Sequence, residues 1–465
     1  MASGPDIRAR VPGATIDDVG DGLLLRHARP EDAEAVAALN ADVHRANDEA
    51  GPDERIASWT RDLLLRPHPT MTPAHTLVVE DTATGDIAST LVLIPQTWTF
   101  GGVPFGVGRI ELVSTARPYR RRGLVRRQME EVHRWSAASG DLAQAITGIP
   151  WYYRQFGYEM TLHLGGERQI VLPRQPTGPT VVAVDSVATA DATPDDRPGY
   201  NVRPATLADV PALIAIDDHA QRRGLISCVR NAAVWRYHLD TSGQDGIAAW
   251  DIRVVTARDG SVVAYLIADG TPSGDRLQVV RLETGPSTPW VEIISPILAW
   301  ANERAGELSR DARTTVDVVS LELGPDHPVY PLLSGRVLRS RRPYAWYVRV
   351  PDVPAFLRHV RPVLERHLAA SPAAGFTGDV TLSTYREGVT IHLRRGVIEA
   401  VEPWPAPDAT ASARFPDLTF LRLLTGWRDL DELEHAFPDC FVRDEHRAVI
   451  AGLFPRRDSW IWPLD

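Results

Sequence analysis

Arginines crowd around a single glycine in the stretch YRRRGLVRRQMEEVHRW, residues 119–135. From Leu124 onward apolar residues recur at helical spacing, so Gly123 stands where a helix begins. The first turn of a helix carries unpaired N–H groups and the positive end of the helix dipole, and a glycine there leaves room for an anion to approach. Because the neighbouring arginines add charge-assisted hydrogen bonds, the pattern predicts a phosphate-binding turn.

A strand and a helix must hold this turn in place. Residues 110–115 (IELVST) form a short β-prone run, and the ARPY sequence after them turns the chain. In the helix that follows, the apolar side chains share one face and leave Arg126, Arg127 and the two glutamates outside. A further strand-like run, LAQAITGI at 142–149, comes next. The order strand, basic turn, helix, strand is typical of an α/β domain.

Composition excludes several functions. The 465 residues predict two or three domains, and the 44% of hydrophobic residues is enough to fill their cores. The net charge of −10 disfavours nucleic-acid binding and mildly favours a cationic or amine-bearing ligand. The chain contains no lysine. This excludes a pyridoxal-phosphate Schiff base, the phosphate-binding lysine of nucleoside triphosphatases and the strand lysine of protein kinases.

Cysteine usage and the N-terminal sequence predict a cytoplasmic protein. Cys228 and Cys440 lie too far apart in sequence for a disulfide framework or a cysteine metal site, and the histidines show no metal-binding spacing. We therefore expect no metal. The first residues contain no apolar run of signal-peptide length, and no stretch of about 18 uninterrupted apolar residues occurs anywhere, so we expect no membrane association.

Three segments of the sequence differ in their pattern of strand-like and helical runs. Residues 22–172 and 200–347 each alternate strand-like and helical runs, and a Pro-, Thr- and Asp-rich stretch beginning at Pro173 connects them as a linker or an irregular connection. The third segment has a helix at 355–370, strands at 378–403 and further helix. We predict α/β domains at 1–175 and 176–347 and an α+β domain at 348–465.

The first two segments begin alike. LRHARPEDAEAVAALNADVHR and VRPATLADVPALIAIDDHAQR align at an offset of about 177 residues, which pairs Arg26 with Arg203 and Asp32 with Asp209. Each aspartate falls at the expected start of a helix. The alternative is two unrelated strand-to-helix junctions, and we favour a duplication. Duplication does not imply two active sites.

The motifs resemble a known family. The run from Arg120 to Val125 resembles the Arg/Gln-x-x-Gly-x-Gly/Ala pyrophosphate loop of GNAT acyltransferases, with a valine at the last small position, and IPWYYRQFGYEM at 149–160 resembles their later tyrosine motif. The whole chain resembles the enhanced intracellular survival proteins, which have two GNAT-like halves and a sterol-carrier-protein-like domain. This resemblance implies acetyl transfer from acetyl-CoA, as cosubstrate, to a small-molecule amine such as an aminoglycoside. It also implies a homo-oligomer, namely a hexamer.

The resemblance also implies roles for single residues. Backbone groups of Val113 and Thr115 would bind the pantetheine arm, with ordinary strand pairing as the alternative. The pyrophosphate would lie on the turn, although Arg121 or Arg122 could instead face solvent; the residues of this turn are Arg120, Arg121, Arg122, Gly123 and Leu124. Tyr153 would be the general acid for the departing thiolate, and Tyr152 or a core role for the ring is the alternative.

The base is left open between two carboxylates. Glu111 could take the amine proton through water, and a salt bridge is nearly as plausible a role for it. The apolar end SWIWPLD predicts that the C-terminal tail packs against the protein. In the family that this chain resembles, the C-terminal carboxylate enters the site of the first domain, and here that carboxylate belongs to Asp465. Asp42 and Asp48 could contact a cationic substrate or simply face solvent.

The second segment lacks the loop. RLETGPSTPWVEIISPILAWANERA, from Arg281, has a strand-like start and a helix but no Arg-x-x-Gly-x-Gly, so we predict a structural copy without cofactor. Two other functions stay open. One is a non-catalytic acyl-CoA or lipid-binding module, and the other is acetylation of protein lysines or N-termini.

Overall fold

The computed structural model describes residues 11–47, 49–172, 199–240, 249–271, 274–312 and 315–462, and the predicted linker lies almost entirely outside them. The chain divides into two compact units. The first contains residues 1–163, 223–229 and 345–459, and the second contains residues 164–222, 230–344 and 460–465. No helix among the described residues is both long enough and apolar enough to cross a membrane.

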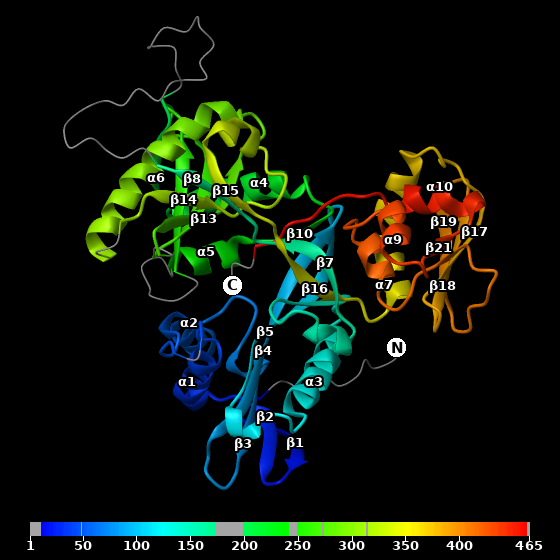
Figure 1. Cartoon of the computed structure of the whole chain (residues 1–465), viewed down its shortest axis with the longest axis horizontal. Coiled ribbons are helices and arrows are strands. Elements are labelled where there is room, and N and C mark those ends of the chain that lie inside the picture. The colour runs from blue at the N-terminus through cyan, green and yellow to red at the C-terminus, as the bar shows by residue number, and fades with distance from the viewer. Residues whose placement is uncertain are drawn as a thin grey trace, which may run out of the picture. The chain divides into compact units, whose positions relative to one another are not determined.

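A nine-stranded sheet with helices on both faces forms the part of the first unit that carries the basic turn. Its order is β1-β2-β3-β4-β5-β6-β16-β7, and β10 pairs with β4. Figure 1 shows α1 and α2 on one side and α3 on the other. The strands are β1 (Thr15–Gly20), β2 (Leu23–His27), β3 (Thr76–Asp81), β4 (Ile87–Phe100), β5 (Val103–Thr115), β6 (Ala143–Ile146), β7 (Glu159–Leu164), β10 (Ile226–Cys228) and β16 (Tyr344–Arg349), and the helices are α1 (Ala33–Val43), α2 (Glu54–Leu65) and α3 (Leu124–Ala138).

Each face of this sheet has its own core. Leu124, Met129 and Val132 of α3 pack with Leu25, Leu77, Leu91 and Ile110 of the strands. Val36 of α1 and Leu64 of α2 pack against Val78 and Ile87 on the opposite face. The helical spacing noted in the sequence therefore gives α3 its buried stripe and leaves the arginines outside.

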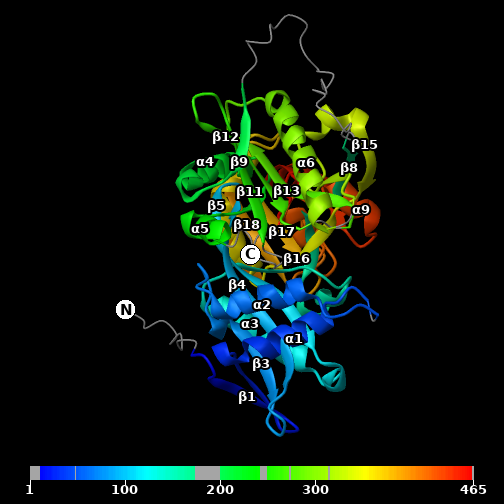
Figure 2. The same ribbon diagram turned by 90° about the vertical axis from the view of Figure 1, so that its left-hand side faces the viewer.

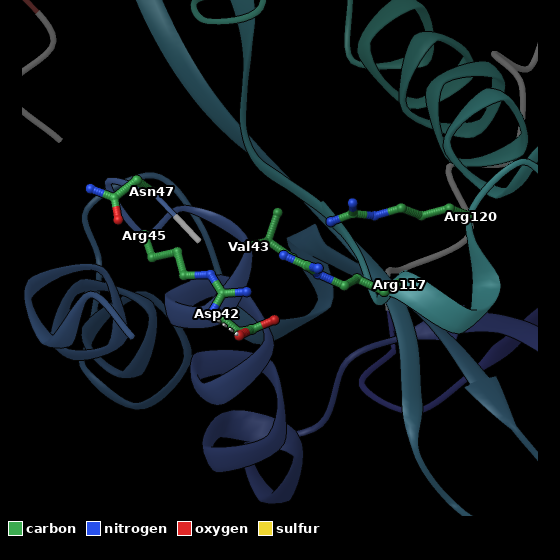
Figure 3. A pocket seen from close by; sticks show the side chains of 6 residues that line it. All are labelled: Asp42, Val43, Arg45, Asn47, Arg117 and Arg120. Atoms are coloured by element: carbon green, nitrogen blue, oxygen red, sulfur yellow. Dashed lines mark ion pairs between the residues drawn. The ribbon is translucent and has the colours of Figure 1, made fainter. Parts of the chain in front are cut away.

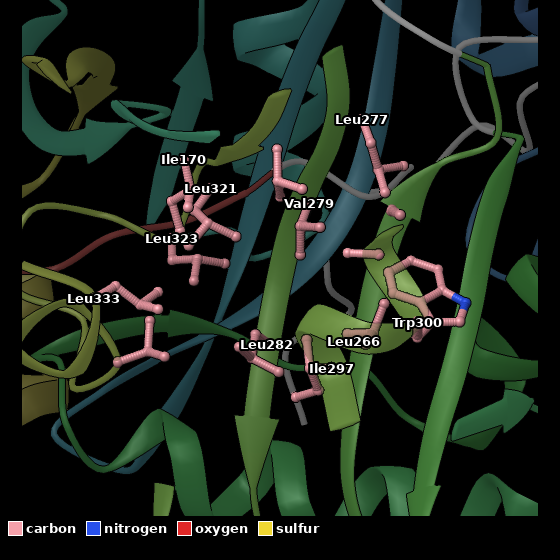
Figure 4. Close-up of a cluster of buried hydrophobic side chains, with 14 of the residues drawn as sticks. Ile170, Leu266, Leu277, Val279, Leu282, Ile297, Trp300, Leu321, Leu323 and Leu333 are labelled. Carbon is pink, nitrogen blue, oxygen red and sulfur yellow. The ribbon is translucent and has the colours of Figure 1, made fainter. Parts of the chain in front are cut away.

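The second unit contains a seven-stranded sheet of order β15-β8-β14-β13-β12-β11-β9. Helix α6 lies along this sheet (Figure 2), and the core between them gathers the aliphatic side chains and Trp300 drawn in Figure 4. The strands are β8 (Glu167–Val171), β9 (Asn201–Pro204), β11 (Trp250–Thr256), β12 (Val262–Asp269), β13 (Arg276–Thr284), β14 (Val318–Leu321) and β15 (Val337–Arg341), and the helices are α4 (Val210–Gln221), α5 (Ala232–Asp240) and α6 (Trp290–Ala312).

The two junctions that align in the sequence have the same local structure. Arg26 donates two hydrogen bonds to Asp32, of 2.6 and 2.8 Å, and Arg203 donates two of 2.8 Å to Asp209. Each aspartate also accepts a backbone N–H three residues earlier and ends a short 3-10 turn, at 30–32 and 207–209, that leads into the helix. The pairs found in the sequence are therefore matching ion pairs that fix matching turns.

The chain exchanges one strand between the two sheets, which the sequence did not predict. After β7 the chain enters the second unit, where β8 pairs with β14 and β15. It returns through β16, which pairs with β6 in the first sheet. Each sheet is thus completed by a strand from the other half of the sequence.

The predicted helix and strands of the third segment are present within the first unit. A five-stranded sheet of order β19-β18-β17-β20-β21 packs with the long helix α7. Its elements are α7 (Val353–Ala369), β17 (Gly378–Ser383), β18 (Gly388–Arg394), β19 (Val397–Trp404), β20 (Ala413–Arg414), α8 (Phe420–Leu424), α9 (Leu430–Ala436), β21 (Phe441–Val442) and α10 (Asp444–Leu453). The sterol-carrier likeness and the three-domain division stay predictions.

Candidate active site

The candidate site begins where β5 separates from β6. These parallel strands pair only from Val107 to Ile110, although β5 continues to Thr115. Within the described residues, the last five residues of β5 have no strand partner on this edge. A bulge lies in the same stretch, because Leu112 has a φ of 52° and the register with β4 shifts there. The open edge leaves backbone groups available to an extended ligand.

The predicted ligand-binding strand residues lie on this open part. Glu111, Val113 and Thr115 are partly exposed and alternate with buried Leu112 and Ser114. The end of the strand is tied to the sheet and to α3 through Ser89, whose hydroxyl lies 2.9 Å from the Thr115 hydroxyl and 2.7 Å from the amide oxygen of Gln128. The backbone at Thr115 is therefore fixed while its edge stays open.

The basic turn follows at once and opens α3. Gly123 is the N-cap with a φ of 77°, the left-handed region that favours glycine. No side chain caps the helix, and its first turn contains no acidic residue. The backbone N–H groups of this turn are therefore available to an anion. A Cβ at Gly123 would meet no protein atom within 4 Å, so the space beside it is open.

The arginines of the turn differ in what they contact. Arg120 donates from Nε to the carbonyl of Thr115 at 3.2 Å, and Arg122 lies 5.4 Å over the ring of Tyr119. Arg120, Arg121, Arg122 and Gly123 are exposed, whereas Leu124 is buried in the core beneath α3. Leu124 can therefore offer only its backbone to a ligand.

A pocket of about 380 Å³ lies between this turn and the end of α1 (Figure 3). Arg117 and Arg120 face Asp42 and Arg45 across it. Asp42 is 3.5 Å from Arg45, so its charge is partly balanced. The remaining lining residues are Val43 and Asn47. The sequence reasoning named Asp42 and Arg120 but did not connect them, and it assigned no role to Arg45 or Arg117; Asp48 lies outside the described residues.

Tyr153 lies in a short 3-10 helix, Tyr152–Phe156, directly after β6. Its side chain is only 4% exposed and is surrounded by aromatic rings. The ring centroids of Tyr152, Tyr347 and Tyr158 lie 5.1, 5.7 and 6.4 Å away. Tyr152, the alternative acid, is more exposed, and burial raises its pKa. Tyr347 comes from β16 and had no signal in the local sequence.

The two candidate bases stand differently. Glu111 accepts a hydrogen bond from Nε of Arg109 at 3.0 Å and lies 2.9 Å from its Nη2, so the salt bridge expected as its alternative role is formed. Asp465 lies outside the described residues. The apolar tail before it packs within the second unit, where Trp460 donates from Nε1 to the carbonyl of Gly165 at 3.1 Å and the carbonyl of Trp462 accepts from Arg230 at 3.2 Å. Within the described residues, no three metal-ligating side chains gather in one place.

Comparisons with known proteins agree with these features. A model of the acetyltransferase (GNAT) domain family matches residues 25–161, which span the open strand, the basic turn and Tyr153. No curated protein matches the chain in sequence.

Solved structures are similar over nearly the whole chain. A GCN5-related N-acetyltransferase from Kribbella flavida has a TM-score of 0.61 at 17% identity, covering 97% of this chain and 100% of that one. A probable N-acyltransferase from Enterococcus faecalis V583 has a TM-score of 0.61 at 14% identity, covering 94% of this chain and 97% of that one. Eis1 from Mycobacterium abscessus has a TM-score of 0.55 at 15% identity, covering 94% of this chain and 98% of that one. At these identities the likeness shows the fold, and it confirms the predicted mixed α/β, GNAT-like architecture.

Proposed function

We propose that this chain, which contains a GNAT acetyltransferase domain over residues 25–161, is an N-acetyltransferase that transfers acetyl from acetyl-CoA to a small-molecule amine. One observation carries the proposal. The open edge of β5 leads directly into an uncapped helix start whose N-cap is a left-handed glycine. An extended thioester arm ending in a pyrophosphate fits this order of an open strand edge and a phosphate-binding turn.

Acetyl-CoA is held in this proposal by backbone groups more than by side chains. Val113 and Thr115 pair with the pantetheine arm as an added strand would. Gly123 and Leu124 offer backbone N–H groups to the pyrophosphate, and Arg120, Arg121 and Arg122 supply the positive charge. Because Arg120 is already held by the carbonyl of Thr115, it links the two parts of the site.

The chemical step needs a proton acceptor and a proton donor. The neutral amine attacks the thioester carbonyl, the C–S bond breaks, and the departing sulfur takes a proton from the Tyr153 hydroxyl. The amine loses its proton to a carboxylate or to water. We propose the carboxylate of the C-terminal residue, Asp465, as the acceptor, with Glu111 or water as the alternative. The carboxylate of Glu111 is already paired with Arg109.

A thiol-release assay with acetyl-CoA and a panel of amines tests the proposal. The panel includes aminoglycosides, simple diamines and a lysine peptide. Release that depends on one of the small amines supports the proposal, and release with the peptide alone would assign protein acetylation instead. Binding of acetyl-CoA without release for any amine would favour the alternative, a non-catalytic acyl-CoA or lipid-binding module.

Assembly and location belong to the same proposal. A homo-oligomer, namely a hexamer, is proposed from the resemblance noted in the sequence, and light scattering of the purified chain tests it. A cytoplasmic location is proposed from the cysteine usage. Cell fractionation checks it.

A further inference from the structure

The strand that returns from the second unit enters the sheet beside the candidate site. In β16, Tyr347 lies opposite Ile146, the last paired residue of β6. The segment after β6 is the one that carries Tyr153. Tyr347 is fully buried, with no exposed surface. A residue from far along the chain is thus built into the core next to the proposed acid.

The hydroxyl of Tyr347 makes two hydrogen bonds to this segment. It accepts the backbone N–H of Trp151 at 2.5 Å and donates to the carbonyl of Ile149 at 3.2 Å. Its ring contacts the ring of Tyr153 edge to face, with centroids 5.7 Å apart. One side chain therefore holds both the backbone before Tyr153 and the ring of Tyr153 itself.

The segment needs to be held because its backbone is strained. Trp151 has a φ of 62°, in the left-handed region that side chains larger than glycine rarely adopt. Its own side chain is 57% exposed and so gives little packing to compensate. A strained conformation persists only when the surrounding structure fixes it. The bond from Trp151 to Tyr347 is placed to do this.

The second unit uses the exchanged strand in the same way. Arg168 on β8 lies opposite Leu321, the last paired residue of β14. Its guanidinium donates to the carbonyl of Pro325 at 3.1 Å and lies 4.1 Å over the ring of Tyr330. The exchanged strand thus supports a tyrosine and its preceding loop in both units, with different chemistry. Only Tyr347 also takes a backbone N–H from the loop.

We propose that Tyr347 is a positioning residue for acetyl transfer, and this rests on the proposed role of Tyr153. Its hydroxyl fixes the backbone from Ile149 to Trp151, so that the phenol of Tyr153 stays aligned with the departing sulfur. Small misplacements of a catalytic group are costly, since about 1 Å can change a rate by about a hundredfold. The proposal predicts an effect on turnover and not on acetyl-CoA binding.

A double-mutant cycle tests this. Tyr347→Phe keeps the ring and removes only the hydroxyl, and we expect kcat to fall about tenfold while the Kd for acetyl-CoA changes less than twofold. In the Tyr153→Phe background the same substitution should lower kcat less than twofold further, because the group being positioned is gone. Arg168→Met is the matched control, and its kcat should equal that of the parent.

The outcomes separate the two proposals. Equal losses from Tyr347→Phe in both backgrounds would overturn the positioning role and leave Tyr153 as the acid. Full turnover of Tyr153→Phe would overturn the acid, and with it the role of Tyr347. A second readout does not need turnover: tryptic cleavage after Arg154 should be several-fold faster in Tyr347→Phe than in the parent, and unchanged cleavage would contradict the proposed hold on the loop.

Discussion

The strand-to-helix junctions of the two units have the same backbone arrangement and differ in the side chains that surround it. In the first, β5 pairs with β6 over four residues and then runs on with an open edge; in the second, β13 pairs with β14 over four residues and runs on to Thr284. The first junction continues into an uncapped helix start. In the second junction, a side chain of the same unit contacts the part of β13 that has no pairing with β14.

That side chain belongs to His327, which is buried. It is 6% exposed, and its Nε2 lies 2.9 Å from the carbonyl of Leu282, on the part of β13 beyond the pairing with β14. Its ring contacts those of Trp290 and Tyr330 at 4.9 and 5.9 Å. A backbone carbonyl on the part of β13 beyond its pairing with β14 is therefore bonded within the second unit.

A tyrosine stands at the same offset in each half of the sequence. Tyr330 begins the 3-10 helix after β14, as Tyr153 belongs to the one after β6. The hydroxyl of Tyr330 accepts the N–H of Leu323 and donates to the carbonyl of Leu321, both at 3.2 Å, and burial raises its pKa to about 12. In the second unit the strand carbonyl and the tyrosine hydroxyl are thus both bonded within the junction itself, and we predict one acetyl-CoA site per chain, in the first unit.

The largest expected effect comes from filling the open turn. Gly123→Val should weaken acetyl-CoA binding about a thousandfold, because the side chain occupies the space beside the helix N–H groups that the pyrophosphate requires. Calorimetry measures the affinity and the number of sites, which should be one per chain in the parent.

The matched control is Gly140→Val. Gly140 has a φ of 80°, and a Cβ there also meets nothing within 4 Å, so both variants carry the same left-handed strain. Equal losses of affinity in the two variants would assign the effect to destabilised backbone, and two sites in the parent would contradict the difference between the units.

Replacing Tyr153 or Tyr330 by phenylalanine, one at a time, tests whether only the tyrosine of the first unit takes part in turnover. Tyr153→Phe should lower kcat about a hundredfold with acetyl-CoA affinity nearly unchanged, because only the proton donor for the thiolate is removed. Tyr330→Phe, its counterpart in the second unit, should leave kcat unchanged. A loss below about threefold for Tyr153→Phe would move the acid to Tyr152 or water.

Moving the C-terminal carboxylate tests the proposed base. Several glycines added after Asp465 keep every side chain and displace the terminal charge, so kcat should fall at least about tenfold. The melting temperature should hold, because the packing of Trp460 and Trp462 is untouched. Undiminished turnover would move the base to Glu111, and Glu111→Gln would then carry the loss instead.

Local patterns predicted much of the first unit and little of what distinguishes the two. The strand before the turn and the helix from Leu124 were predicted correctly because apolar periodicity is a local signal. The pairs Arg26–Asp32 and Arg203–Asp209 were found because both partners lie within one short motif. Tyr347 and Arg168 were missed because their strands pair with residues more than a hundred positions away, and such pairing leaves no mark on nearby residues.

The last expected effect is on stability and not on activity, and it concerns a buried acid of the second junction, Glu322. Glu322 directly follows β14, where the first unit has Thr147 after β6. Burial and the neighbouring Glu167 together raise the pKa of Glu322 to about 7, against the opposing charge of Arg341. Between its ordinary value and pH 7 the folded protein holds a proton that the unfolded chain has released, so stability falls as pH rises through this range.

Replacing this acid should therefore stabilise the second unit only at higher pH. We expect Glu322→Gln to match the parent near pH 4 and to exceed it by roughly 2–3 kcal/mol in free energy of unfolding at pH 8, since one pKa unit corresponds to about 1.4 kcal/mol. Urea unfolding at the two pH values measures the difference. Glu307→Gln, a half-exposed position on α6, is the control. A Glu322→Gln advantage that is equal at both pH values would mean that the carboxyl titrates alike in the folded and the unfolded protein, so that its burial does not raise its pKa.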